Sequence, residues 1–244
     1  STSRSLEEWH QILGHVNKGS ILHLESVVDD MKISKKNDFF CDTCVLDKQV
    51  VNINRVHDVR ATVSGELIHS DLNGPIDPVA REGFRYAINF VDDYSGSCFV
   101  YFLKQKCDAT KALEKFICDF APFGKIKRMR SDNGGEYVSS DYENVLIKNQ
   151  IRHEFSAPYT PHQNGTAERN WRTLFEMARS MLVESNLPKF LWTYAVMASA
   201  HIRNRMFRKR ISDTAYHLLT GKKPSISKLH RFGSICYANI HQKK

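Results

Sequence analysis

From residue 66 onward, the chain alternates between short segments rich in β-branched and aromatic residues and longer amphipathic segments. The short segments predict five strands, at residues 66–72, 84–92, 96–104, 125–131 and 151–155. The amphipathic segments predict four helices, at residues 107–120, 140–150, 165–185 and 188 to about 207. Three strands followed by alternating helices and strands indicate an α/β fold, with a mixed five-stranded sheet and flanking helices on both faces.

The first 55 residues follow a different pattern, because their short helical pieces supply few apolar side chains. A unit this small usually needs a staple to fold. It contains two close pairs of metal-binding side chains, His10 with His15 and Cys41 with Cys44. Zinc takes four tetrahedral nitrogen and sulfur ligands, and each spacing lets both members of a pair reach one ion. The segment therefore predicts a small helical HHCC domain that binds one structural Zn²⁺.

Each pair also has a simpler explanation when it is taken alone. Two histidines fit on the surface of a helix, and a Cys-x-x-Cys pair fits a redox site. We favour zinc because both pairs occur in one segment that otherwise lacks a core. The other four cysteines are far apart in the sequence and fit reduced core residues, which suggests a reducing compartment.

Three acidic residues lie at the ends of predicted elements. Asp71 ends the first predicted strand, Asp132 follows the fourth, and Glu168 lies in the first turn of the long helix. Such residues can converge at one edge of a sheet, where hard cations such as Mg²⁺ or Mn²⁺ relieve their repulsion. Two ions about 3.5–4 Å apart would then promote an in-line displacement at phosphorus. We predict that Asp71, Asp132 and Glu168 are catalytic and hold two such ions.

Ordinary explanations exist for these acids as well. The Asp-Asn-Gly-Gly sequence at 132–135 is a good turn, and an acid in a first helical turn favours the helix dipole. Asp71 precedes an Asn-Gly-Pro turn. The occurrence of all three acids beside a glycine-rich loop favours a catalytic site over these explanations.

Positive charge is concentrated near the end of the chain. The formal net charge is +8, and beyond residue 200 there are 11 basic residues against one acidic residue. The densest run contains Arg203, Arg205, Arg208, Lys209 and Arg210. This run predicts a surface that contacts phosphates, with a solvated helix end as the alternative. No stretch of roughly 18 consecutive apolar residues occurs, so we expect no membrane partner.

The ordered series of motifs resembles the copia-type branch of LTR-retrotransposon integrases, within the retroviral-type integrases. The resemblance covers nearly the whole chain. The motifs that carry it are Trp9-His10, Leu13-Gly14-His15, Cys41-x2-Cys44, His69-Ser70-Asp71, the Ser-Asp-Asn-Gly-Gly-Glu-Tyr run at 131–137, the Pro-His-Gln-Asn-Gly-Thr-Ala-Glu-Arg run at 161–169, Leu191-Trp192, Asn204-Arg205 and the Leu-Thr-Gly-Lys-Lys-Pro run at 219–224.

The resemblance implies an RNase H-like catalytic core of the DDE polynucleotidyl transferase type. Its activity would be Mg²⁺-dependent 3′-end processing of element cDNA and strand transfer into target DNA, with both nuclease and joining steps. Asp71 and Asp132 would share one ion, and Glu168 would complete the second site. The implied partners are double-stranded DNA and further copies of the chain, in a dimer or larger assembly. The implied location is the nucleus, with the cytoplasmic virus-like particle as a second one.

DNA-binding residues are predicted from the same motifs and from the basic run. By motif alignment, Tyr159 and Asn164 fall where the family's active-site loop meets DNA ends. Two arginines shortly after Glu168 point to phosphate contacts, with solvated helix charge as their alternative. The full predicted set is Tyr159, Asn164, Arg169, Arg172, Arg205, Arg208, Lys209 and Arg210.

The predicted domain organisation has four parts. We expect the zinc-binding domain at 1–55, a linker at 56–65, the catalytic core at 66–207 and a basic C-terminal extension at 208–244. Because integrases of this type carry a small β domain and a long tail beyond such an extension, we expect the chain to be a fragment.

Two other functions remain open at this point. A related RNase H-like nuclease would cut DNA without joining it, and its mark would be a fourth carboxylate, for which Asp92, Asp93 and Glu136 are the candidates. A domesticated, non-catalytic DNA-binding or assembly protein could also retain an intact triad.

Overall fold

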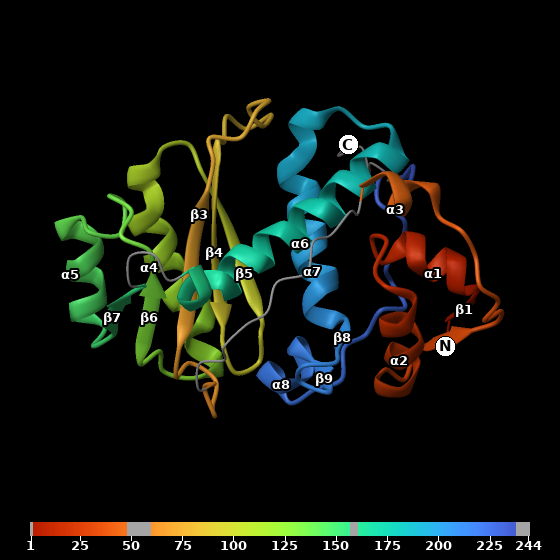
Figure 1. The fold of residues 1–244 in the computed structure, drawn as a ribbon, viewed down its shortest axis with the longest axis horizontal. Helices are drawn as coiled ribbons and strands as arrows, with labels where there is room; N and C mark the ends of the chain where they lie inside the picture. The colour runs from red at the N-terminus through yellow and green to blue at the C-terminus, as the bar shows by residue number, and fades with distance from the viewer. Residues whose placement is uncertain (1, 48–59, 157–160, 238–244) are drawn as a thin grey trace, which may run out of the picture.

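The computed structural model describes residues 2–47, 60–156 and 161–237, and a five-stranded sheet lies at its centre (Figure 1). The strand order is β5-β4-β3-β6-β7. Strands β3 to β5 pair antiparallel, whereas β3, β6 and β7 run parallel. The predicted mixed sheet is therefore confirmed. The strands are β3 (Ile68–Asn73), β4 (Tyr86–Asp92), β5 (Cys98–Leu103), β6 (Arg128–Ser131) and β7 (Arg152–Phe155).

Helices cover both faces of the sheet because the side chains of β4 alternate between two cores. Ile88 and Phe90 pack with one pair of helices, and Phe90 stacks on Phe116 with ring centroids 4.3 Å apart. Ala87 and Val91 pack with the other pair. The first pair is α4 (Ala109–Phe120) and α5 (Ser140–Lys148), and the second pair is α6 (Pro161–Ser185) and α7 (Trp192–Arg205).

The order of elements follows the prediction, with small shifts at the ends. Helix α6 begins four residues earlier than the predicted residue 165, at a proline, which is well suited to a first helical position. Short 3₁₀ turns precede α4 at Lys106–Asp108, follow it at Ala121–Phe123 and precede α7 at Lys189–Leu191. None of the described helices is both long enough and apolar enough to cross a membrane.

The N-terminal unit is built from short elements joined by a two-stranded parallel sheet. Its first helix starts with a capping box, in which Ser5 and Glu8 satisfy each other's backbone donors. The elements are β1 (Thr2–Arg4), α1 (Leu6–Ile12), α2 (Lys18–Val27), β2 (Met31–Ile33) and α3 (Asp42–Asp47).

The core of this unit is shared with the rest of the chain. Buried Trp9 and Leu13 belong to the same apolar cluster as Met177 and Met181 of α6 and Ile226 near the C-terminus. Figure 1 shows α6 running from the sheet to the N-terminal unit. The sequence predicted that a metal would replace a missing core. The structure shows that neighbouring helices also supply apolar surface, which no local pattern could reveal.

The predicted basic extension folds back onto the N-terminal unit instead of standing apart. The carboxylate of Asp30 accepts hydrogen bonds from the backbone N–H groups of Ile226 and Ser227, both at 2.8 Å, and from Ser225 Oγ at 2.6 Å. The small elements in this part are β8 (Phe207–Arg208), β9 (Asp213–Thr214) and α8 (Ala215–Thr220). Residues 48–59, which include the start of the predicted linker, lie outside the described residues.

Candidate active site and metal centre

The four predicted zinc ligands form one tight cluster. Cys41 Sγ lies 3.3 Å from His15 Nδ1, and Cys44 Sγ lies 3.3 Å from His10 Nε2 and 3.8 Å from His15 Nδ1. All four ligand atoms lie within 4.8 Å of one another. Tetrahedral bonds of about 2.3 Å to sulfur and 2.0–2.1 Å to nitrogen require donors roughly 3.4–3.8 Å apart, so the cluster fits a zinc ion.

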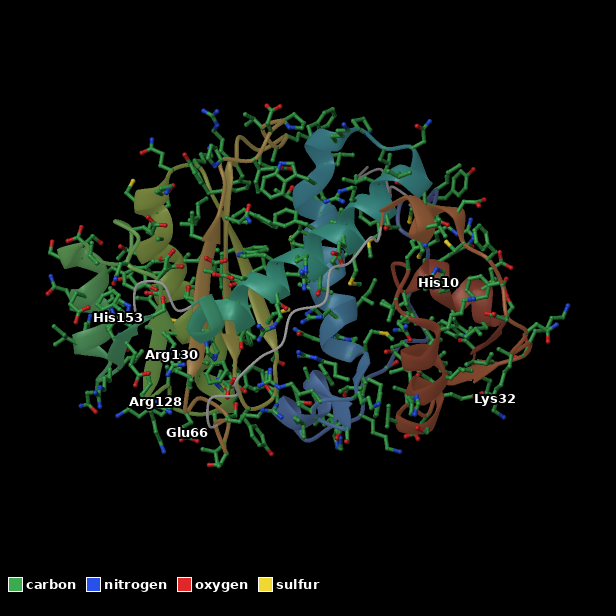
Figure 2. The ribbon with its side chains drawn as sticks, in the orientation of Figure 1. His10, Lys32, Glu66, Arg128, Arg130 and His153 are labelled. Carbon is green, nitrogen blue, oxygen red and sulfur yellow. The ribbon has the colours of Figure 1, made fainter. Side chains whose placement is uncertain are left out.

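Local structure aims the two histidines at this cluster. His10 lies in α1, and its outer nitrogen Nδ1 is 2.9 Å from the carbonyl oxygen of Val16 (Figure 2). His15 follows in a left-handed turn, with φ of 70° at Gly14 and 60° at His15. Its outer nitrogen Nε2 lies 3.2 Å from the carboxylate of Glu184 on α6. Partners of this kind fix ring orientation and leave the inner nitrogens for a metal.

The ends of strands β3 and β6 bring together the first two predicted catalytic acids. The parallel register pairs Ile68 with Met129 and His69 with Arg130. Continuing this register by two residues sets Asp71 opposite Asp132 at the carboxyl end of both strands.

Helix α6 brings Glu168 to the same edge. The indole Nε1 of Trp171 donates to the backbone oxygen of Asp71 at 3.1 Å, and Asn89 Nδ2 donates to the carbonyl oxygen of Ala167 at 3.1 Å. Ala167 and Trp171 lie on either side of Glu168 in the sequence. Their bonds therefore attach this part of α6 to strands β3 and β4.

The pKa of Asp71 depends on its burial and on the two other acids. Burial is the largest effect, and repulsion from Asp132 and Glu168 adds to it, so the pKa of Asp71 rises to about 7. Asp132 and Glu168 are exposed. The site therefore combines one half-buried carboxylate with two exposed ones, an arrangement that a divalent cation would stabilise.

A tight loop follows Asp132. Its Oδ1 accepts a hydrogen bond from the backbone N–H of Gly134 at 3.0 Å, and the Tyr137 N–H bonds the Gly134 carbonyl at 2.9 Å. A Cβ at position 134 would lie 2.9 Å from Glu136 Cδ, so a larger residue there would require the Glu136 side chain to shift. Glu136 is mostly buried, and its carboxylate lies 3.8 Å from Lys106 Nζ.

Of the three candidates for a fourth carboxylate, only Glu136 acts on the site. It contributes to the raised pKa of Asp71. Asp92 pairs with Ile68 at the opposite end of β3 and accepts the Gly65 N–H at 2.9 Å. Asp93 follows it and bonds the Ala61 N–H at 2.8 Å. Both of these acids therefore serve the fold.

Comparison with known proteins agrees with this geometry. Residues 61–161 match the family described as the integrase core domain, and residues 1–49 match the GAG-pre-integrase domain. Over residues 61–161 the chain is therefore similar to integrase core domains. Its curated relatives are Pol polyproteins of copia-type retrotransposons. The chain is 34% identical, over 98% of its length, to the retrovirus-related Pol polyprotein from transposon TNT 1-94 of Nicotiana tabacum, and it spans 18% of that polyprotein.

Solved structures show the same fold. The simian T-cell lymphotropic virus intasome in complex with PP2A regulatory subunit B56 gamma aligns with a TM-score of 0.58 at 20% identity, over 82% of this chain and 69% of that chain. The HTLV-2 integrase catalytic core domain in complex with magnesium aligns with a TM-score of 0.52 at 16% identity, over 66% of this chain and 99% of that chain. The predicted fold class is therefore confirmed.

Sequence reasoning missed a polar group that supports the end of strand β6 beside Asp132. Buried Ser131 Oγ lies 2.9 Å from the Asp132 carbonyl oxygen and 2.9 Å from His153 Nε2, and His153 Nδ1 lies 3.2 Å from Glu143. Figure 2 shows His153 in strand β7, near Arg130 of the neighbouring strand β6. No spacing in the sequence distinguishes these residues, because their partners come from different elements.

The predicted DNA-binding residues differ in their exposure and in their contacts. Tyr159 and the side chain of Asn164 lie outside the described part of the chain. Arg172 is exposed on α6, and Arg169 Nη2 donates to Thr166 Oγ1 at 3.4 Å. Lys209 is exposed after β8.

The remaining basic residues separate into an exposed and a buried group. Arg210 is exposed, with Nη2 lying 3.9 Å from an Asp93 oxygen. Arg205 lies 4.6 Å over the Tyr216 ring. Arg208 is largely buried and donates to the Gly96 carbonyl at 2.6 Å, and burial lowers its pKa to about 9. The guanidinium of Arg208 is therefore engaged inside the fold, which argues against its predicted phosphate contact.

Proposed function

We propose that this chain is a fragment of a copia-type retrotransposon integrase. It would catalyse Mg²⁺-dependent 3′-end processing of element cDNA and strand transfer into target DNA. The observation that carries the proposal is geometric: the β3–β6 register sets Asp71 opposite Asp132, and Trp171, three residues after Glu168, bonds the Asp71 backbone. The integrase core match over residues 61–161 supports the same reaction class.

The three carboxylates fit a pair of hard divalent cations. Asp71 and Asp132 would hold one Mg²⁺ or Mn²⁺ between the ends of β3 and β6, and Glu168 would complete a second site. Bound there, the ions would activate the attacking oxygen and stabilise the leaving oxygen. A solved relative of the same fold is described in complex with magnesium.

The protein's own groups prepare this site. Trp171 holds the Asp71 backbone and Gly134 holds the Asp132 carboxylate, so both ligands are positioned before metal binds. Asp71 must lose its proton to coordinate, and the raised pKa makes this step sensitive to pH near neutrality. Exposed Asp132 and Glu168 leave the edge open to a phosphodiester.

The other partners follow from the same comparison. His10, His15, Cys41 and Cys44 would hold one structural Zn²⁺, in agreement with their donor distances. Exposed basic residues would contact double-stranded DNA. The similar structures are described as an intasome and as a trimeric core, so we propose that this chain works as an oligomer. We also propose that it acts in the nucleus, with the cytoplasmic virus-like particle as a second location.

A strand-transfer reaction tests the proposal. The chain is incubated with Mg²⁺, supercoiled plasmid and a short duplex that mimics an element end. We expect joined products, their loss in Asp132→Asn, and their retention in Asp141→Asn, which removes an exposed acid in the first turn of α5.

Each other outcome supports a different function. Cleavage without joining would indicate an RNase H-like nuclease. DNA binding with neither cleavage nor joining would indicate a non-catalytic DNA-binding or assembly protein.

A further inference from the structure

The zinc cluster is not confined to the N-terminal unit, because one of its outer contacts comes from α6. His15 is 2% exposed, and its Nε2 lies 3.2 Å from Glu184, which is 18% exposed. Glu184 lies in the last turn of α6, and Glu168 lies on the same helix sixteen residues earlier. At about 1.5 Å per residue, roughly 24 Å of helix joins the two glutamates.

The two histidines differ in how their outer nitrogens are held. His10 turns Nε2 toward Cys44 and contacts the nearby Val16 carbonyl oxygen through Nδ1. His15 turns Nδ1 toward both thiols and its Nε2 toward Glu184. A ligating nitrogen needs its lone pair, so with zinc held at Nδ1 the ring proton of His15 would sit on Nε2 and would be donated to the carboxylate. The described partner of the outer His15 nitrogen thus comes from another element, α6.

We propose that Glu184 is a positioning residue of the zinc centre, through which zinc binding fixes the end of the catalytic helix α6 to the N-terminal unit. This inference rests on the proposed zinc site. It assigns a role to a residue of the long helix that is not itself a metal ligand. The zinc centre then connects residues 2–47 to helix α6, in addition to stabilising residues 2–47 themselves. We call this connection the joint.

Apolar packing builds the same joint independently of the metal. A side chain at Gly14 would collide with Met181, which shows how closely the histidine loop lies against α6. Met177 and Met181 are 4% and 2% exposed and share a cluster with Trp9 and Leu13. The loop is thus already placed on α6, and Glu184 needs no large movement to reach His15.

The C-terminal segment completes the surroundings of Glu184. Arg231 Nε lies 3.9 Å from the second carboxylate oxygen of Glu184, and Arg231 Nη2 donates to Gln11 Oε1 at 2.7 Å. His15 and Arg231 therefore face the two oxygens of one carboxylate. This arrangement orients Glu184 toward the histidine loop.

Zinc affinity tests the proposal, measured by competition with a chromogenic chelator. Loss of such a partner usually weakens metal binding about 10–100-fold, and we expect this for Glu184→Gln. Glu176→Gln is the matched control, because it removes the same charge from the same helix, two turns away from Glu184. We expect wild-type affinity from the control. Equal affinity in Glu184→Gln and wild type would overturn the role of Glu184.

A second measurement uses only the wild-type chain. If zinc fixes the end of α6, removing zinc should increase hydrogen exchange at Met177–Ser185 as well as in residues 2–47. Exchange that rises in residues 2–47 alone would overturn the joint. A Co²⁺-loaded chain without a tetrahedral thiolate spectrum would instead show that the zinc site itself is wrong, which separates the two failures.

Discussion

The indole nitrogen of Trp171 donates a hydrogen bond to the backbone oxygen of Asp71 across 3.1 Å, from a side chain that is only 2% exposed. Trp171 lies three residues after Glu168, so the bond joins the helix turn of one proposed catalytic acid to the strand end of another. The bond therefore holds the backbone at Asp71 against the turn of α6 that carries Glu168.

Trp171→Phe should lower strand-transfer activity beyond what its loss of folding stability explains. Phenylalanine keeps an aromatic ring but is smaller than indole, so the Asp71 carbonyl loses this donor and some buried packing is lost, at a cost of about 1–3 kcal/mol in the free energy of unfolding. Trp192→Phe is a close control. Trp192 Nε1 donates to the carbonyl oxygen of Pro78 at 3.1 Å, and neither residue belongs to the triad. Urea unfolding should show similar losses for both variants, whereas joined products should fall only for Trp171→Phe. Equal activity in the two variants would contradict this.

The raised pKa of Asp71 predicts a pH-dependent stability of the metal-free protein. The pKa is about 7 in the folded chain against 3.8 for an ordinary aspartate. The folded state therefore binds this proton more tightly, and the resulting stabilisation is complete below about pH 4 and lost as the pH rises through about 7. Urea unfolding without metal should show that the advantage of Asp71→Asn over wild type grows from pH 5 to pH 8.

Mg²⁺ should remove the stability difference between Asp71→Asn and wild type at pH 8, because it binds the deprotonated Asp71 carboxylate of the wild type. Calorimetric titration should show tighter Mg²⁺ binding at pH 8 than at pH 6 in wild type. A binding constant that does not change over this range would contradict the coupling between Asp71 and the metal.

Arg208 and Lys209 should behave differently although they are neighbours. Arg208→Ala leaves the buried Gly96 carbonyl without its donor, so the free energy of unfolding should fall by about 1–3 kcal/mol. Lys209→Ala and Arg172→Ala remove exposed charges, so each should lower the slope of log affinity for DNA against log salt by about 1 without affecting stability. Fluorescence anisotropy at several salt concentrations measures this slope. If the slope falls in Arg208→Ala alone, then Arg208 contacts DNA and Lys209 and Arg172 do not, which contradicts the prediction.

His153 should matter for activity because it supports the strand end that carries Asp132. His153→Ala removes the partner of Ser131 Oγ and leaves a space in the core, so we expect lower strand transfer and a loss of about 1–3 kcal/mol. His153→Gln retains a donor at this position and should restore part of both. If the two variants have the same activity, hydrogen bonding by His153 is not what positions Asp132.

The sheet and its helices could be predicted because their signals are local. Strand β4 carries aromatic and β-branched residues, and α4 carries apolar residues at helical spacing. The triad could be proposed from acids at element ends, but its closeness depends on the register that sets Asp71 opposite Asp132.

Other features depend on contacts between distant parts of the chain. Glu184 is a helix glutamate with no distinguishing neighbours in the sequence, and its partner His15 lies 169 residues away. Arg208 lies in a uniform basic run, and its burial depends on the Gly96 carbonyl of a distant turn. Local patterns carry no information about either contact.

The bonds from Asp30 to the backbone of Ile226 and Ser227 place the early and late parts of the chain against each other. Fragments designed from the linear order of domains would cut through this arrangement. Removing residues 2–47 or residues 208–237 would expose apolar residues of the cluster that both parts share with α6, including Met177 and Met181, so either truncation should favour aggregation. Expression trials therefore gain most from retaining both parts, even when only the catalytic sheet is of interest.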